Sequence, residues 1–217
     1  MSETISVVIP TIRPRVRLCM RALASVLGQK RLPDEIIVEM DDEGVGAPKT
    51  RNRGLRQASG DWIAFLDDDD ELLPQHLERL EQYANETGAD LVYPWFTVVG
   101  GTATDPFPQF FGKEWDNDKP HQTTISFLVR REAALAVGGF PDDFTWADDA
   151  WATGEDYQFV LRLREAGYKI VHLPERTWRW HWHYSNLQGG NTGGVPWRQR
   201  FAFEEKRAAE REAGTKK

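Results

Sequence analysis

Four consecutive aspartates, Asp67, Asp68, Asp69 and Asp70, directly follow the apolar run of residues 62–66. Adjacent carboxylates repel each other, and a divalent cation relieves that repulsion. Hard ions such as Mg²⁺ or Mn²⁺ prefer carboxylate oxygens and often share them with a substrate's phosphates. The alternative is a solvated acidic turn that caps the next helix. Because ligands gather at the carboxyl ends of strands in open α/β sheets, we favour the metal site.

A second group of polar residues follows the two apolar runs that precede this one. Pro10, Thr11 and Arg13 come after the run at residues 5–9, and Asp41 and Asp42 come after residues 35–40. In a parallel sheet both groups lie on the same edge as the aspartates. A carboxylate there can accept the N3 hydrogen of uracil or the N1 and N2 hydrogens of guanine. The alternative is that Asp41 and Asp42 cap a turn before a glycine.

The segment Arg51, Asn52, Arg53 and Gly54 begins a predicted helix between the second and third runs. The amino terminus of a helix with arginines beside it suits anionic groups. For one of the two arginines, the alternative is a solvated basic face.

A further acidic pair, Glu155 and Asp156, follows Gly154 at the start of another predicted helix. Acidic residues are favoured there by the helix dipole alone. Asp156, however, lies at the edge of the apolar stripe formed by Phe159 and Leu163, so it faces the body of the protein. A carboxylate in that position can act as a general base toward an acceptor hydroxyl.

Histidines and tryptophans alternate in the late segment RTWRWHWHYSNLQGGNTGG. In an extended conformation, alternation puts His181 and His183 on one face and the tryptophans on the other. A histidine from a distant segment can complete a carboxylate metal site, and His183 is the preferred ligand with His181 the alternative. The glycines that follow indicate a loop that orders over a ligand.

Short apolar runs alternate with helical patterns along the chain, which predicts an α/β sheet. The first predicted helix carries an apolar stripe of Val16, Met20, Leu23 and Leu27, spaced by three and four residues. Two stretches, about 100–121 and 140–154, have no clear period. Strands are predicted at 5–9, 35–40, 62–66, 91–99, 124–130 and 168–173, and helices after PTIRPR, at 50–58, from Pro74 to Gly88, at 131–137, at 155–166 and from Pro196.

Composition limits the class of protein. The 217 residues are 40% hydrophobic and 28% charged with a formal net charge of -7, which argues against indiscriminate nucleic-acid binding. Nine tryptophans suit a flat, polyhydroxylated or heterocyclic ligand. Cys19 is the single cysteine, so an intramolecular disulfide is excluded. Neither a signal peptide nor an apolar run of roughly 20 residues is visible, so we expect no membrane span and a cytoplasmic location.

Taken in order, these segments resemble the family 2 glycosyltransferases of GT-A fold. The matching segments are ISVVIPT, EIIVEMDDEG, KTRNRGLRQASGDWIAFLDDDDELLP, SFLVRREAALAVGGF, GEDYQFVLRLREAGYKI and HYSNLQ, which together span from about residue 4 to about residue 190, with an unmatched gap near residues 100–120. The resemblance implies inverting transfer of a sugar from a nucleoside diphosphate sugar, with UDP or GDP as the nucleotide, to an acceptor hydroxyl.

The resemblance also implies roles for single residues. Asp67 and Asp69 match the family's Asp-x-Asp motif, with Asp69 the direct ligand of Mn²⁺ or Mg²⁺ on the diphosphate. Asp156 matches the catalytic base and Glu155 is its neighbour. The residues expected at the nucleotide sugar are Pro10, Thr11, Arg13, Asp41 or Asp42, Arg51, Asn52, Asp67 and Asp68.

The predicted architecture is therefore a GT-A domain over residues 1–195, followed by a helical tail over 196–217. The domain is a mostly parallel sheet flanked by helices, with a short antiparallel element. The aromatic anchors of the tail suggest self-association. Two alternatives are a nucleotidyltransferase of related fold and a non-catalytic nucleotide-sugar-binding module. A nucleotidyltransferase normally has a glycine-rich loop after its first strand, and PTIRPR contains no glycine.

Overall fold

The computed structural model describes residues 3–100, 114–120, 123–142 and 154–181. They belong to one compact unit, Met1–Trp182. The predicted tail helix, the domain boundary at residue 195, His183 and most of the two irregular stretches lie outside the described residues.

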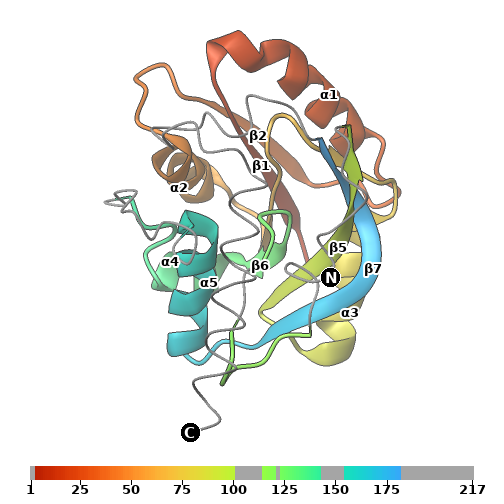
Figure 1. Cartoon of the computed structure of the whole chain (residues 1–217), viewed down its shortest axis with the longest axis vertical. Coiled ribbons are helices and arrows are strands. Elements are labelled where there is room, and N and C mark those ends of the chain that lie inside the picture. The colour runs from red at the N-terminus through yellow and green to blue at the C-terminus, as the bar shows by residue number, and fades with distance from the viewer. Residues whose placement is uncertain (1–2, 101–113, 121–122, 143–153, 182–217) are drawn as a thin grey trace, which may run out of the picture. The chain divides into compact units, whose positions relative to one another are not determined.

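The described residues form one seven-stranded mixed sheet in the order β2-β1-β3-β6-β5-β7-β4 (Figure 1). β1 is parallel to β2 and β3, and β5 is parallel to β7, whereas β6 and β4 pair antiparallel with their neighbours. Five strands therefore share one direction, which confirms the mostly parallel sheet with a short antiparallel element. The strands are β1 Ile5–Thr11, β2 Glu35–Met40, β3 Trp62–Phe65, β4 Glu71–Leu72, β5 Leu91–Val99, β6 Leu128–Arg130 and β7 Ile170–His181.

Helices cover both faces of this sheet. On one face, α2, α4 and α5 pack over a core that includes Leu55, Ala133 and Phe159. On the other face, α1 contacts β1 and β4, and α3 contacts β5 and β7. The helices are α1 Val16–Leu27, preceded by the 3-10 turn η1 Arg13–Arg15, then α2 Ala47–Gln57, α3 His76–Thr87, α4 Arg131–Ala136 and α5 Glu155–Glu165. Within the described residues, none of the helices is both long enough and apolar enough to cross a membrane.

Two predicted strands differ from the observed ones by more than two residues at one end, and the two-residue strand β4 was not predicted. The strand predicted over 124–130 shortens to β6, and the one predicted over 168–173 continues as β7 to His181. The extension follows from tertiary pairing, since Phe96 of β5 packs its ring on Trp178 at 5.0 Å and on Trp180 at 6.1 Å. Both tryptophans thus lie on one face of β7, as the alternation predicts.

The apolar stripe of α1 does not pack on the sheet. Cys19, Ala22 and Val26 are the buried residues of this helix, whereas Met20 and Leu27 are 62% and 60% exposed. The smaller side chains allow the helix to approach β1 closely, and the larger ones point outward.

An aromatic cluster packs α5 against β3. Phe140 packs edge-on against Phe65 of β3 at 5.0 Å and stacks on Phe159 of α5 at 4.5 Å. Such buried aromatic pairs add to the stabilisation from burial. The start of α5 is therefore held near the aspartates that follow β3.

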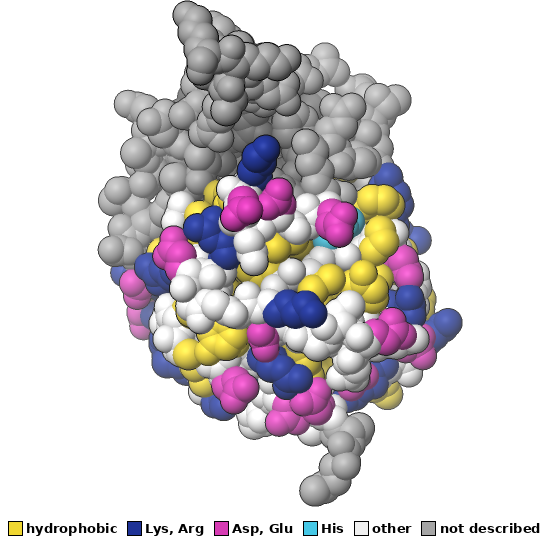
Figure 2. Space-filling view, turned by 90° about the horizontal axis from the view of Figure 1, so that it is seen from below, with side chains coloured by type: hydrophobic (Ala, Val, Ile, Leu, Met, Phe, Trp, Pro, Cys, Tyr) yellow, Lys and Arg dark blue, Asp and Glu magenta, His cyan; other side chains and the backbone are white. Residues whose placement is uncertain are grey.

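The described surface seen in Figure 2 is mixed in charge. Acidic and basic side chains lie side by side on this face, with apolar side chains between them. A broad basic surface of the kind that neutralises nucleic-acid phosphates is not seen on the described part of this face.

Candidate active site

The carboxyl ends of β1, β2 and β3 meet at one edge of the sheet, as the parallel pairing requires. The backbone N–H of Asp41 donates to the Thr11 carbonyl at 2.8 Å. The Thr11 hydroxyl donates to Asp68 Oδ2 at 2.7 Å. The structure thus brings together residues that the sequence separates by up to 57 positions.

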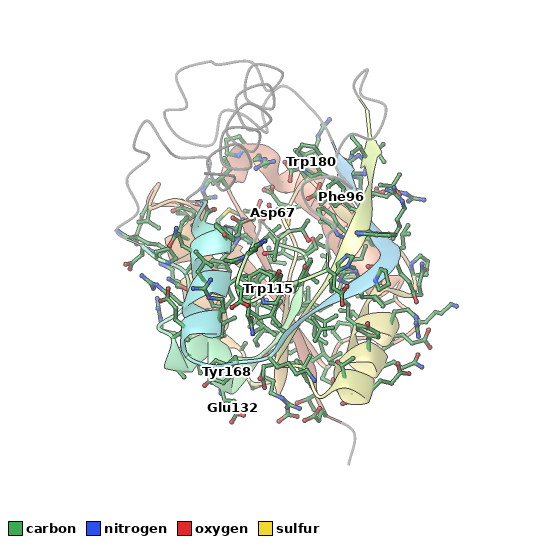
Figure 3. All side chains as sticks on the ribbon, turned by 60° about the horizontal axis from the view of Figure 1, so that its bottom comes forward. Asp67, Phe96, Trp115, Glu132, Tyr168 and Trp180 are labelled. Carbon is green, nitrogen blue, oxygen red and sulfur yellow. The ribbon has the colours of Figure 1, made fainter. Side chains whose placement is uncertain are left out.

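Three of the four aspartates can share a cation. One carboxylate oxygen each from Asp67, Asp69 and Asp70 lies within 4.8 Å of the others. Asp69 and Asp70 are buried, and Asp67 is partly exposed. Figure 3 places Asp67 between α5 and β5, with Phe96 and Trp180 on the side of the strand. A set of three carboxylates fits a hard cation such as Mg²⁺ or Mn²⁺.

Burial makes this cluster electrostatically unfavourable by itself. Burial, together with the charges of Asp69 and Asp67, raises the pKa of Asp68 to about 6 despite its bond from Thr11. Burial and the same two neighbours raise the pKa of Asp70 well above its ordinary value. A bound cation favours the ionised carboxylates and reverses this trend.

Two arginines that sequence reasoning missed lie on the aspartates. Arg15 of η1 forms ion pairs with Asp68, at 3.1 Å, and with Asp69. Arg21 of α1 donates to the Asp69 carbonyl at 2.5 Å and pairs with Glu71 at 3.4 Å. The signal in the sequence was a basic segment, residues 12–33, that contains no acidic residue. Its closeness to the acidic run is seen in the fold and not in the sequence. By contrast, the predicted Arg13 forms an exposed ion pair with Asp42 at 2.7 Å.

Arg51 connects the aspartates to the acidic pair on α5. Its buried guanidinium contacts Asp67 Oδ1 at 2.6 Å and Glu155 Oε1 at 2.9 Å, and lies 5.5 Å from the centre of the Phe140 ring. Although burial opposes it, the two carboxylates raise the pKa of Arg51. A fixed positive charge therefore lies between Asp67 and Glu155.

Asn52, the neighbour of Arg51, binds backbone in this structure. Its amide donates to the Phe140 carbonyl at 2.8 Å and accepts from the Phe140 N–H at 2.8 Å. The preceding Gly139 has φ +74°, and a Cβ there would lie 2.3 Å from Asn52 Oδ1. The contact therefore requires glycine and ties α2 to the aromatic cluster; the role of Asn52 at the nucleotide sugar stays a prediction.

Asp156 lies in the first turn of α5, next to this network. Burial and the charge of Glu155 raise the pKa of Asp156 to about 7, while Arg51 and the backbone N–H of Tyr157 act in the opposite direction. The N–H of Tyr157 lies 2.8 Å from Asp156 Oδ1. A carboxylate with this pKa is matched to proton abstraction near neutral pH.

His181 contacts the acidic segment in two ways. Its Nε2 lies 3.1 Å from Glu71 Oε2, and its backbone N–H donates to Asp70 Oδ1 at 2.9 Å. Arg179 lies 3.3 Å from the same Glu71 oxygen, so both side chains lie on one face of β7. The imidazole thus reaches Glu71, and the backbone orients Asp70. The preferred ligand His183 lies outside the described residues.

Asp41 closes a turn. Its two carboxylate oxygens accept from the N–H groups of Val45 and Gly46, each at 2.9 Å. Burial opposes ionisation, but these backbone bonds lower the pKa of Asp41. The turn that was the alternative interpretation is therefore present, and base recognition by Asp41 or Asp42 stays a prediction. Pro10 lies at the same edge, in β1 opposite Glu39.

Comparison with known proteins places the chain in a family. Residues 29–140 match the family model for glycosyl transferase family 2. The glycosyltransferase AglE of Haloferax volcanii is 31% identical over 148 residues, which are 64% of this chain and 45% of AglE. The uncharacterized glycosyltransferase YwdF of Bacillus subtilis is 32% identical over 199 residues, covering 78% of this chain and 71% of YwdF. A beta-1,3-glucosyltransferase of Campylobacter jejuni is 35% identical over 108 residues, or 38% of this chain and 35% of that protein.

The fold is shared with solved structures. TarS 1–349 of S. aureus in complex with UDP-GlcNAc superimposes with a TM-score of 0.67 at 16% identity, covering 89% of this chain and 61% of that one. This likeness confirms the predicted GT-A fold. The chain spans less than half the length of several relatives, AglE among them. Since the family model matches more than half of the sequence, the chain belongs to glycosyl transferase family 2.

Proposed function

We propose that this chain is a metal-dependent, inverting glycosyltransferase that moves a sugar from a UDP- or GDP-sugar to an acceptor hydroxyl. One observation carries the proposal: three carboxylates within reach of one cation are joined, through the buried Arg51, to the acidic pair that begins α5. Family membership favours transfer of a sugar over the nucleotidyltransferase alternative.

On this proposal the aspartates hold Mn²⁺ or Mg²⁺. Asp67, Asp69 and Asp70 supply the oxygens. When bound, the ion offsets the negative charge that builds on the departing diphosphate. Arg15 pairs with Asp69 and Arg51 with Asp67, so both arginines add positive charge beside the leaving group.

The nucleotide end of the donor is expected at the ends of β1 and β2. Thr11, Asp41 and Asp42 lie there, and the Arg13–Asp42 ion pair forms the exposed rim. The structures of TarS with UDP and with UDP-GlcNAc support a nucleotide sugar as the donor. The acceptor stays undefined beyond its hydroxyl group.

Asp156 is the proposed general base. Its carboxylate takes the proton of the acceptor hydroxyl while the acceptor oxygen bonds to the anomeric carbon. The bond to the diphosphate breaks on the opposite face, so the anomeric centre inverts. Glu155 is held by Arg51 and raises the pKa of Asp156, which makes it a positioning residue.

The test compares Asp156→Asn with Glu165→Gln, an exposed carboxylate at the other end of the same helix. Nucleotide sugars are screened with Mn²⁺ for transfer or hydrolysis, and donor binding is measured by calorimetry. We expect Asp156→Asn to lose transfer by 10²–10⁴-fold, the usual range for a general base, with donor binding kept. Unchanged turnover in Asp156→Asn would contradict this assignment.

The binding-module alternative predicts a different result from the same screen. It requires donor binding without any turnover in the unsubstituted chain. The cytoplasmic location and the self-association expected from the tail stay predictions.

A further inference from the structure

In the part of the chain that the structure describes, the large exposed apolar side chains are concentrated in one segment. Seven large hydrophobic side chains are exposed among the described residues, and six of them fall between positions 12 and 38. Scattered exposed apolar residues are ordinary, but a concentration of them marks an interaction surface. The six are Ile12, Val16, Met20, Leu27, Leu32 and Val38.

Three of these six side chains lie in one stripe along α1. Val16, Met20, Leu23 and Leu27, here called the α1 face, are spaced by four, three and four residues, so they lie along one side of the helix. Val16, Met20 and Leu27 are 45%, 62% and 60% exposed. The helix packs on the sheet through other residues, so the α1 face is not needed for the core.

The charge around the α1 face is one-sided. Residues 12–33 contain six of the chain's 27 basic residues and none of its 34 acidic ones. Four of the six arginines and lysines form ion pairs with carboxylates from other segments. Arg17 and Lys30 are exposed and have no carboxylate partner among the described residues. They lie near the two ends of the α1 face.

We propose that the α1 face docks on an anionic membrane surface, with α1 lying in the plane of the interface. An exposed apolar stripe flanked by cations is the pattern of helices that insert one side into the boundary between headgroups and acyl chains. Arg17 and Lys30 contact the lipid phosphates, and the apolar side chains enter the acyl region.

The connection between α1 and the candidate active site gives this docking a consequence. η1 directly precedes α1, and its Arg15 pairs with Asp68 and Asp69, while Val16 begins the α1 face. Arg15, which contacts the aspartates of the candidate site, is therefore the residue next to the first residue of the α1 face. An acceptor anchored in the same membrane would be presented beside the aspartates. The docking itself does not depend on the proposed sugar transfer.

The apolar part is tested by flotation of the full chain with vesicles of 30% phosphatidylglycerol and 70% phosphatidylcholine, without metal or donor. We expect Met20→Glu/Leu27→Glu to reduce the bound fraction at least about tenfold, because two buried apolar side chains are replaced by charge. The matched control is Leu135→Glu, an exposed apolar residue on α4, which should bind as the unsubstituted chain does. Circular dichroism verifies that each variant is folded.

The charge is tested with Arg17→Glu/Lys30→Glu, which should weaken binding to the anionic vesicles several-fold and remove its dependence on salt. Arg56→Glu/Lys119→Glu, at exposed basic positions elsewhere, is the control. The proposal is overturned if the unsubstituted chain does not float, if Met20→Glu/Leu27→Glu floats equally well, or if phosphatidylcholine alone binds as strongly. It is also overturned if light scattering shows a vesicle-free dimer that Met20→Glu/Leu27→Glu dissociates.

Discussion

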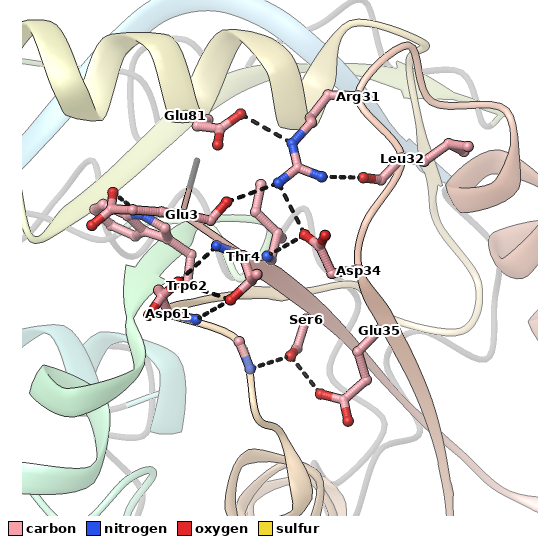
Figure 4. Close-up of polar contacts among 12 residues, drawn as sticks. Glu3, Thr4, Ser6, Arg31, Leu32, Asp34, Glu35, Asp61, Trp62 and Glu81 are labelled. Atoms are coloured by element: carbon pink, nitrogen blue, oxygen red, sulfur yellow. Dashed lines mark hydrogen bonds and ion pairs between the residues drawn. The ribbon is translucent and has the colours of Figure 1, made fainter. Parts of the chain in front are cut away.

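The two edges of the sheet use the same acidic residue types in opposite ways. At the amino edge, Asp34 accepts from the Ile5 N–H at 2.8 Å, and Glu35 accepts from the Ser6 hydroxyl at 2.6 Å (Figure 4). These bonds lower the pKa of Asp34 and of Glu35. At the carboxyl edge, burial instead raises the pKa of Asp70.

The amino edge is closed by its own partners. Asp61 accepts from both the N–H and the hydroxyl of Thr4, and Glu3 accepts from Arg130 and from the Trp62 indole. The bond from Arg130 is the main cause that lowers the pKa of Glu3, and the bond from the Thr4 N–H does the same for the pKa of Asp61. An acid whose charge is offset by its hydrogen bonds stabilises the fold, whereas buried acids whose pKa is raised by burial and by neighbouring carboxylates mark a candidate site for a cation.

We expect the largest effect from a substitution among the aspartates at the carboxyl edge. Asp69→Asn removes one of three proposed cation ligands, so we expect transfer to fall by about 10²–10⁴-fold and Mn²⁺ affinity to fall with it. Calorimetry with Mn²⁺ and a transfer assay measure the two effects. Full Mn²⁺ affinity in this variant would remove Asp69 from the metal site.

The second prediction concerns the removal of a carboxylate at the amino edge. Glu35→Ala leaves the buried Ser6 hydroxyl without its carboxylate, so the free energy of unfolding should fall by about 2 kcal/mol, with turnover unchanged. Urea denaturation measures this change. Glu39→Ala on the same strand, which loses an exposed bond from Gln57, is the control with a smaller expected loss.

The third prediction uses pH to sharpen the contrast. Because the pKa of Asp156 is raised to about 7, its carboxyl group is mostly protonated below that pH and cannot accept the acceptor's proton. The rate at saturating donor and Mn²⁺ should therefore fall about tenfold for each pH unit below 7. Mn²⁺ affinity, measured at each pH, separates this loss from titration of the aspartates. A flat profile between pH 5 and 8 would contradict the role of Asp156.

The smallest expected effect is a gain in stability at the carboxyl edge, opposite in sign to the loss expected for Glu35→Ala at the amino edge. Asp70→Asn keeps an oxygen to accept from the His181 N–H but removes a buried charge. Without metal at pH 8, the variant should be more stable to unfolding by about 1 kcal/mol, while its Mn²⁺ affinity falls. Thermal unfolding with and without Mn²⁺ checks both statements, and a loss of stability without metal would show that Asp70 is structural.

Local sequence pattern is enough to predict the order of the helices and of the longer strands along the chain, and the positions of the acidic residues. Runs rich in apolar residues at 5–9, 35–40 and 62–66 predict parallel strands, and parallel strands end at one edge. The meeting of Thr11, Asp41 and the aspartates follows from that rule. β1 and β3 are buried, whereas β2 is only partly buried because it lies at the edge of the described sheet. Local pattern is sufficient to predict these strands because the residues that define each strand are neighbours in the sequence. The shared edge then follows from the parallel arrangement.

The side-chain contacts at that edge depend on tertiary packing, which local sequence pattern does not reveal. The ion pairs of Arg15 with Asp68 and Asp69 join residues more than 50 positions apart, and the backbone bond from His181 to Asp70 spans 111. The outward direction of Met20 and Leu27 likewise depends on how closely α1 approaches β1. Periodicity finds an apolar stripe, but the packing of small side chains between distant segments determines which side of a helix is buried.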